Sequence, residues 1–247
     1  GCDASIHIDS GNGSYLYQTE MASSKNFEIR KREVIGFLKS IVEIVCPESV
    51  SCADLIVLAA REAVALSGGP WISLPLGRKD SPLPASYELA DALLPSPAIG
   101  VDGMLKLFGR IGLTVEESVA IMGSHSLGVT HCANIPTRET GSGSICQPPG
   151  GSLLSSSLSN SSFVQNDPTA VVFDNEYYVG AMLGRGVLRV DEEMAKEERT
   201  ARFVGGFAAD QGEFFRAFGS AFVKLAGKGV LTGRQGMVRK ECDLVGN

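Results

Sequence analysis

His125 is the histidine whose surroundings best suit chemistry. It lies within residues 123–128, GSHSLG, after a stretch whose apolar residues recur at helical spacing. Thr114 and Glu117 form a capping box, which predicts that this helix begins at residue 114. An imidazole at an apolar helix end suits a haem iron ligand, and the small residues beside it would let a flat ligand approach the backbone. Considered alone, the stretch favours the competing interpretation, a hydrogen-bonded core histidine.

Composition limits the class of protein. The 247 residues are enough for one large domain or two small ones, and 44% hydrophobic and 20% charged residues are typical of a globular protein. The net charge of −6, with no basic run, argues against nucleic acid or another polyanion as a partner. No apolar run predicts a membrane span. The chain begins at Gly1 without a signal peptide, so we expect a mature, truncated or partial sequence.

The cysteines indicate the redox environment. There are six, and none forms a C-x-x-C pair, which disfavours a zinc ribbon and favours disulfides in an oxidising compartment. Asn12 and Asn160 begin glycosylation acceptor sequences, which agrees with secretion.

Hydrophobic periodicity predicts a mainly α fold. We expect helices over about 27–45, 51–67, 101–110, from 114 onward, 173–183 and 210–225. In the first, apolar residues between Val34 and Val45 share one face and Lys39 is directed outward. The second is apolar nearly all round, so we expect it to be buried. Residues 71–100 are proline-rich and predict extended chain, residues 10–25 and 133–165 predict loops, and no segment shows the alternation of a strand.

Six short motifs follow one another along the chain: GCDAS at 1–5, VSCADL at 50–55, LPLGRKDS at 74–81, GSHSLG at 123–128, VFDNEYY at 172–178 and VLRVDEEM at 187–194. Together they resemble the class III haem peroxidases, the secretory plant peroxidases, over essentially the whole chain. The resemblance implies the all-α haem peroxidase fold as a single domain, 1–247, with a distal-side remainder over about 1–110 and a proximal half over about 111–247. The family's distal helix precedes the GCDAS motif and is not encoded in these 247 residues.

The resemblance assigns the proximal side of a haem b site. His125 matches the iron ligand, and Asp191 matches the carboxylate that accepts a hydrogen bond from the other imidazole nitrogen. A carboxylate in that place raises the basicity of the ligand. Without His125 in register, Asp191 would be interpreted as a solvated turn residue.

Two calcium sites are also implied, and hard oxygen ligands suit them. The proximal ligands match Ser126, Thr169, Asp174 and the carbonyl of Val172. The family's first aspartate of that loop aligns with Asn166, and Asp167 replaces it after a shift of one residue. The distal ligands match Gly1, Asp3 and Ser5, but the family's other ligands precede Gly1, so this site is incomplete. The competing interpretation for all of them is turn hydrogen bonding.

Further family positions can be matched in the same way. The resemblance implies the disulfides Cys52–Cys242 and Cys132–Cys146, and it leaves Cys2 and Cys46 unpaired because their family partners precede Gly1. Glu20 and Asn26 match the distal hydrogen-bond chain, and Pro95 matches the haem edge where aromatic donors dock. His7 and His131 match positions that the family does not use for acid–base chemistry.

The implied function is oxidation of phenolic donors by hydrogen peroxide, in peroxide catabolism and the response to oxidative stress. The implied protein is a monomer that is secreted to the extracellular space, cell wall or vacuole, with no nucleic-acid or membrane partner. Because the distal histidine and arginine are not encoded, we expect these 247 residues alone to be a poor peroxidase. Two alternatives stay open: a catalytically impaired haem-binding or wall-associated protein, and a disulfide-linked helical binding module without a cofactor.

Overall fold

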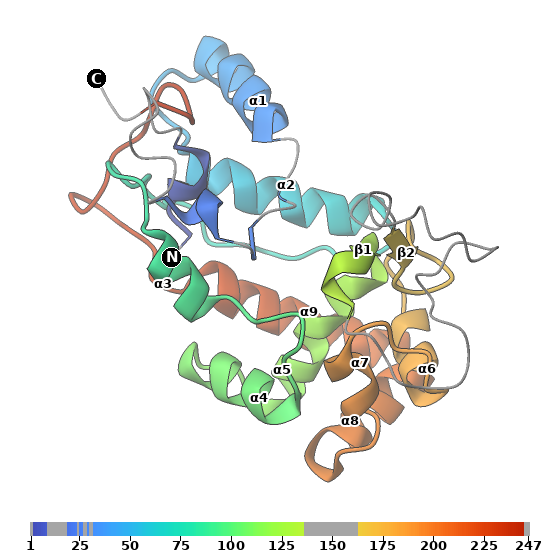
Figure 1. Ribbon diagram of the computed structural model, residues 1–247. Helices are drawn as coiled ribbons and strands as arrows, with labels where there is room; N and C mark the ends of the chain where they lie inside the picture. Colours follow the sequence, from blue (N-terminus) through green and yellow to red (C-terminus); the bar gives the residue numbers. More distant parts are fainter. Residues whose placement is uncertain are drawn as a thin grey trace, which may run out of the picture. The chain divides into compact units, whose positions relative to one another are not determined.

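A computed structural model describes residues 2–8, 19–23, 25–26, 29, 32–135 and 163–244. Over these ranges the chain is mainly α-helical, which confirms the predicted fold class (Figure 1). The α-helices are α1 (Arg32–Val45), α2 (Cys52–Leu66), α3 (Tyr87–Leu93), α4 (Val101–Arg110), α5 (Val115–Met122), α6 (Glu176–Met182), α7 (Arg189–Glu193), α8 (Glu198–Ala209) and α9 (Gln211–Ala226). The 3-10 turns are η1 (Ser5–His7), η2 (Glu20–Ala22), η3 (Gly123–Ser126) and η4 (Cys132–Asn134).

One short strand pair accompanies the helices. β1 (Val129–His131) pairs antiparallel with β2 (Phe163–Gln165), so that Val129 lies opposite Gln165 and His131 opposite Phe163. The sequence predicts no strand, because three residues are too few for an alternating pattern to be recognised.

The chain divides into two compact units, each made of separate stretches of sequence. Unit 1 contains Gly1–Ala63, Ile72–Pro95 and Val223–Asn247, and unit 2 contains Val64–Trp71 and Ser96–Phe222. Each unit therefore depends on contacts between stretches that lie far apart in the sequence.

Buried polar groups fix the start of α2 in unit 1. The fully buried Asp80 carboxylate accepts hydrogen bonds from the backbone N–H groups of Cys52 at 3.1 Å, Ala53 at 2.8 Å and Arg239 at 2.9 Å. A carboxylate at a helix N-terminus satisfies N–H groups that have no partner within the helix. Ser51 also caps this helix, since its Oγ accepts from the Asp54 N–H at 3.0 Å.

Aromatic side chains form the core of unit 2. Phe214 stacks on Phe173 with 5.3 Å between ring centroids and meets Tyr178 edge-on at 4.9 Å. The Tyr178 hydroxyl lies 3.0 Å from the carbonyl oxygens of Val119 and Ala120, which ties α6 to the last turn of α5. A Cβ on Gly123 would come within 2.6 Å of both Phe214 and Tyr178. Gly123 is therefore required for this packing of unit 2.

Helix α3 corrects the prediction of extended chain over residues 71–100. Its seven residues begin at Ser86, whose Oγ accepts from the Leu89 N–H at 3.2 Å. Prolines at 82, 84 and 95 flank it, and a helix this short is hidden by their composition.

Helix α1 has the predicted amphipathic pattern, but its apolar face is exposed over the described residues. Phe37 is 65% exposed, Ile44 82% and Val45 74%. Lys39, in contrast, is buried, and its Nζ donates to Glu43 and to the Val50 carbonyl. The outward direction predicted for Lys39 is wrong because this ion pair and hydrogen bond satisfy the ammonium group inside unit 1.

The central helix α2 is continuously buried only at its start, and in its second half Val64 is buried among residues that are partly or fully exposed. Cys52 to Leu55 are at most 8% exposed, whereas Leu66 is 86% exposed. Complete burial, as the sequence predicts, is therefore wrong for the second half.

Candidate functional site

His125 lies in η3, which continues directly from α5. The predicted capping box forms at the start of α5: Thr114 Oγ1 accepts from the Glu117 N–H at 3.1 Å, and the Glu117 carboxylate accepts from the Thr114 N–H at 2.8 Å. Ser220 of α9 donates a further hydrogen bond to Glu117 at 2.7 Å. Both the start of α5 and its end, packed against Tyr178, are therefore fixed, and with them the position of His125.

Asp191 lies in α7 and is 1% exposed. Its Oδ2 accepts from the backbone N–H of Leu188 at 2.9 Å. A Cβ on Gly186 would come within 2.8 Å of the Asp191 Cβ, so only glycine fits beside this side chain. The carboxylate is held by its own helix start and by close packing, and it is not the solvated turn residue of the competing interpretation.

The structure brings His125 and Asp191 together, with 3.2 Å between His125 Nδ1 and Asp191 Oδ1. Burial raises the pKa of the Asp191 carboxyl, but hydrogen bonds from His125, Tyr177 and the Leu188 N–H outweigh it, so the pKa is lowered overall. An ionised carboxylate can only accept, so the proton is on Nδ1. Nε2 is then the imidazole nitrogen with a lone pair for a metal.

Tyr177 is a neighbour of this pair that the sequence does not predict. Its hydroxyl donates to the same oxygen, Asp191 Oδ1, at 2.6 Å. Its ring meets the imidazole of His125 edge-on, with 5.8 Å between centroids. Burial, followed by the charge of Asp191, raises the pKa of Tyr177 well above its usual value, so the phenol stays protonated. The only signal in the sequence is its place in VFDNEYY, which does not show the contact with α7.

Oxygen atoms predicted to bind calcium also lie together in unit 2. Ser126 Oγ is 3.0 Å from Asp167 Oδ2, 3.2 Å from the Val172 carbonyl oxygen and 3.5 Å from Asp174 Oδ1. Thr169 Oγ1 is 3.0 Å from Asp174 Oδ1. Burial raises the pKa of the Asp167 carboxyl, and the negative charge of Asp174 adds to the effect. Two carboxylates with hydroxyl and carbonyl oxygens are a set of ligands that fits a hard cation.

The side chains of Asn166 and Asp167 point toward different neighbours. Its Oδ1 accepts from Thr130 Oγ1 of β1, while Asp167, at 6% exposure, points into the oxygen cluster. The geometry therefore favours the one-residue shift over the direct alignment.

The residues assigned to the distal side lie in unit 1. Ser5 Oγ is 2.8 Å from Asp3 Oδ1 and 2.6 Å from Glu20 Oε1. Asn26 Nδ2 donates to the backbone oxygen of Glu20 at 2.9 Å, so these two residues are also neighbours. Gly1 lies outside the described residues. Among the described residues there is no group of three or more His, Cys, Asp or Glu side chains that could hold a metal ion.

The other assigned positions are only partly within the described residues. The Cys52–Cys242 disulfide forms, and Cys2 and Cys46 are free thiols. Cys132 is disulfide-bonded, while Cys146, Asn12 and Asn160 lie outside the described residues. Pro95 is exposed and lies shortly after α3. Just before it, Lys25 Nζ donates to the carbonyl oxygen of Asp91 in α3 and, at 2.7 Å, to that of Leu94.

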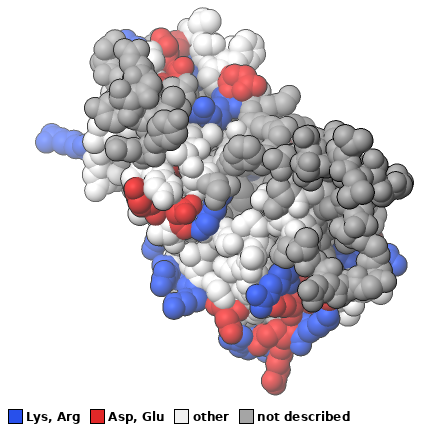
Figure 2. All heavy atoms as spheres, viewed as in Figure 1, with Lys and Arg blue, Asp and Glu red and all other residues white. Residues whose placement is uncertain are grey.

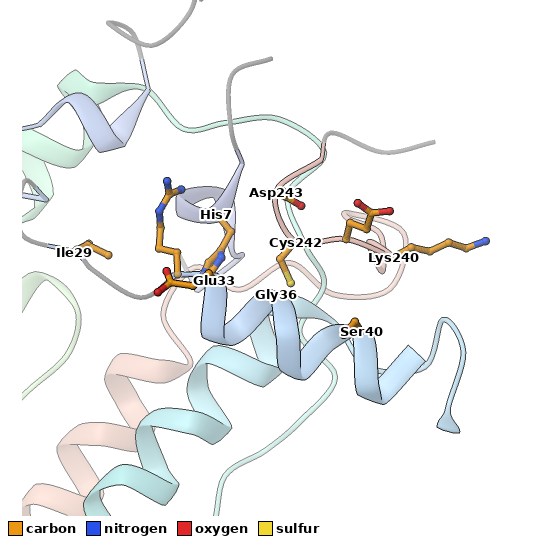
Figure 3. A pocket seen from close by; sticks show the side chains of 10 residues that line it. His7, Ile29, Glu33, Gly36, Ser40, Lys240, Cys242 and Asp243 are labelled. Atoms are coloured by element: carbon orange, nitrogen blue, oxygen red, sulfur yellow. The ribbon is translucent and has the colours of Figure 1, made fainter. Parts of the chain in front are cut away.

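A hollow of about 720 Å³ lies elsewhere, within unit 1 (Figure 3). Its walls come from η1, from Ile29 before α1, from α1 and from the C-terminal segment: His7, Ile29, Arg32, Glu33, Gly36, Ser40, Lys240, Glu241, Cys242 and Asp243. None of the residues assigned to the haem ligand pair or the proximal oxygen cluster lines it.

The charged surface of unit 2 carries side chains of both signs. Acidic and basic side chains are interspersed near α4 and α8 on the face in Figure 2, as the ion pair of Arg199 with Asp102 at 2.5 Å illustrates. Among the described helices, none combines the length and hydrophobicity needed to cross a bilayer.

A buried carboxylate that accepts a hydrogen bond from an imidazole is an arrangement found behind histidine ligands of haem iron and of other metals. The family model for peroxidases matches residues 1–210. Peroxidase 29 of Arabidopsis thaliana is 48% identical over an alignment that is 257 residues long with its gaps. The alignment covers 99% of this chain and 75% of that protein. Peroxidase 17 and Peroxidase 57 of the same plant are 36% and 37% identical, and the matches cover 99% and 98% of this chain and 76% and 77% of those proteins.

The chain therefore belongs to the plant peroxidase family, class III. This confirms the resemblance in the motifs and the predicted enzyme class, a haem peroxidase that uses hydrogen peroxide. Haem and calcium are general features of this family.

Proposed function

We propose that His125 binds the iron of haem b through Nε2 and that Asp191 orients and tunes it. The observation that carries the proposal is the 3.2 Å contact between His125 Nδ1 and the buried Asp191 carboxylate. It places the proton on Nδ1 and directs the lone pair of Nε2 away from Asp191. The His125 side chain is 29% exposed, so it is not fully enclosed by the protein.

The chain's own residues have separable roles in this site. Asp191 accepts the Nδ1–H bond and so increases electron donation from the imidazole. Leu188 and Gly186 hold the carboxylate in place. When bound, haem supplies the redox-active iron at which hydrogen peroxide is reduced.

We further propose that calcium binds between η3 and the segment before α6. The ligands are Ser126, Asp167, Thr169, Asp174 and the Val172 carbonyl. Support comes from the two carboxylates that converge on one buried hydroxyl. Burial, and to a smaller extent the charge of Asp174, raises the pKa of Asp167. Because Ser126 follows His125 directly, a cation here would also hold the iron ligand in position.

The remaining parts of the proposal rest on the family. The donors are phenolic molecules, Pro95 contributes to their docking, and the protein is a secreted monomer. The exposed position of Pro95 is compatible with a role in docking.

The test of the proposal is the substitution His125→Ala in the haem-loaded protein. We expect loss of the ferric absorbance and resonance Raman signature of histidine-ligated haem, because no other proximal ligand is proposed. Added imidazole should partly restore the signature. His131→Ala is the matched control, since His131 lies in β1 and is not in the proposed site. An unchanged spectrum in His125→Ala would show that another group binds the iron.

A further inference from the structure

Asp191 accepts three hydrogen bonds, and two of them converge on one oxygen. Oδ1 is 3.2 Å from His125 Nδ1 and 2.6 Å from the Tyr177 hydroxyl, while Oδ2 accepts from the Leu188 N–H at 2.9 Å. The phenol is the nearer of the two donors to Oδ1. A hydrogen bond to a charged acceptor draws electron density toward its donor, so two donors on one oxygen compete.

We propose that Tyr177 is a positioning residue that limits how strongly Asp191 acts on the iron ligand. The inference rests on the proposed function, because it concerns the same His125–Asp191 pair. By donating to Oδ1, the phenol makes that oxygen a weaker acceptor for the imidazole N–H. His125 then donates less electron density to iron than it would with Asp191 alone.

The location of Tyr177 supports a role in tuning. It is 3% exposed, on α6, and its ring also meets Tyr178 edge-on at 5.0 Å. Phenylalanine would keep these ring contacts and remove only the hydroxyl. The hydroxyl has one described partner, the Asp191 carboxylate, so its removal acts on that group.

Asp191 should stay in place when the hydroxyl is removed. The Leu188 N–H still holds Oδ2, and the close packing of Gly186 on the Asp191 Cβ still limits movement of the side chain. The lone pair released on Oδ1 therefore becomes available to His125. This fixes the sign of the effect: removal of the phenol should strengthen the hydrogen bond between His125 and Asp191.

The experiment compares Tyr177→Phe with the unsubstituted protein, both loaded with haem. We expect a lower ferric/ferrous midpoint potential and a higher iron–histidine stretching frequency in the ferrous protein. Tyr178→Phe is the matched control, because its hydroxyl bonds to the Val119 and Ala120 carbonyls and not to Asp191. In the control we expect lower stability and an unchanged potential.

A double-mutant cycle with Asp191→Asn separates tuning from a general effect on folding. In the Asp191→Asn background, Tyr177→Phe should no longer shift the potential, because the charge on which it acts is absent. An unchanged or higher potential in Tyr177→Phe alone would overturn the inference, and so would an equal shift in both backgrounds. Failure of the proposed function is recognised separately, because His125→Ala would then leave the haem spectrum unchanged.

Discussion

At the residue scale, the buried Asp191 carboxylate connects His125, the proposed iron ligand, to the rest of unit 2. Its donors come from three places: η3, α6 and the segment before α7. Burial alone would make this charge costly, and the three hydrogen bonds compensate, so that the pKa of Asp191 is lowered. The Asp191 carboxyl is therefore ionised at neutral pH.

Asp191→Asn tests the role of that charge. The substitution keeps the size of the side chain and removes its charge, so the imidazole becomes a weaker electron donor and the ferric/ferrous midpoint potential should rise. The measurement is a spectroelectrochemical titration of the haem-loaded protein. Asp210→Asn is the control, since Asp210 accepts from the Gly212 N–H at the exposed start of α9. A potential equal to that of the control would exclude the tuning role.

Some residues around Asp191 can be predicted from the sequence, and others cannot. His125 and Asp191 can be predicted because each lies in a recognisable motif, and their 66-residue separation carries no information about distance. Tyr177 cannot be assigned in that way, because its role depends on how α6 approaches α7. The packing role of Gly123 cannot be predicted either: its neighbours are Phe214 and Tyr178, and only the tertiary packing shows them.

At the element scale, the segment between β2 and α6 decides which side chains enter the oxygen cluster. β2 pairs with β1, and this places Asn166 beside Thr130 while Asp167 turns toward Ser126. If the register of β2 against β1 shifted by one residue, Asn166 would take the place of Asp167 beside Ser126. The proposed cation site therefore depends on the register of a three-residue strand.

Asp167→Asn and Asn166→Ala test that register. In the unsubstituted protein, calcium at 100 times its Kd should stabilise the fold by about 2.7 kcal/mol, seen as a higher Tm than in the presence of a chelator. Asp167→Asn should largely remove this calcium-dependent shift, because a carboxylate is replaced by a neutral amide. Asn166→Ala should keep it. The reverse pattern would assign the ligand to Asn166, and no shift in the unsubstituted protein would remove the site altogether.

The helices show what local patterns can and cannot predict. α4 and α9 lie within one residue of both predicted ends, and α5 begins within one residue of its predicted start, because each has a clear apolar face or cap. The pattern of α1 is equally clear, yet its apolar face is exposed and Lys39 is buried. Periodicity identifies which side chains share a face, but which face is covered depends on what packs there.

At the scale of the whole molecule, the chain order and the compact units do not coincide. Unit 1 contains the first and last stretches of the chain, and every residue of unit 2 lies between Cys52 and Cys242 in the sequence. The family could be predicted because its motifs are spread along the whole sequence. The division into units could not, because it depends on contacts between distant stretches.

The Cys52–Cys242 disulfide closes a sequence separation of 190 residues, so it restricts the unfolded chain strongly. The chain-entropy model predicts that its loss costs about 4–5 kcal/mol of unfolding free energy. Cys52→Ala with Cys242→Ala should show this loss in denaturant unfolding under non-reducing conditions. Alanine is chosen because both positions are at most 2% exposed and a serine hydroxyl would be buried there. Cys46→Ala, at an exposed free thiol, is the control and should change stability by less than about 0.5 kcal/mol. A loss in the double variant no larger than in the control would mean that the bridge does not restrain the unfolded chain.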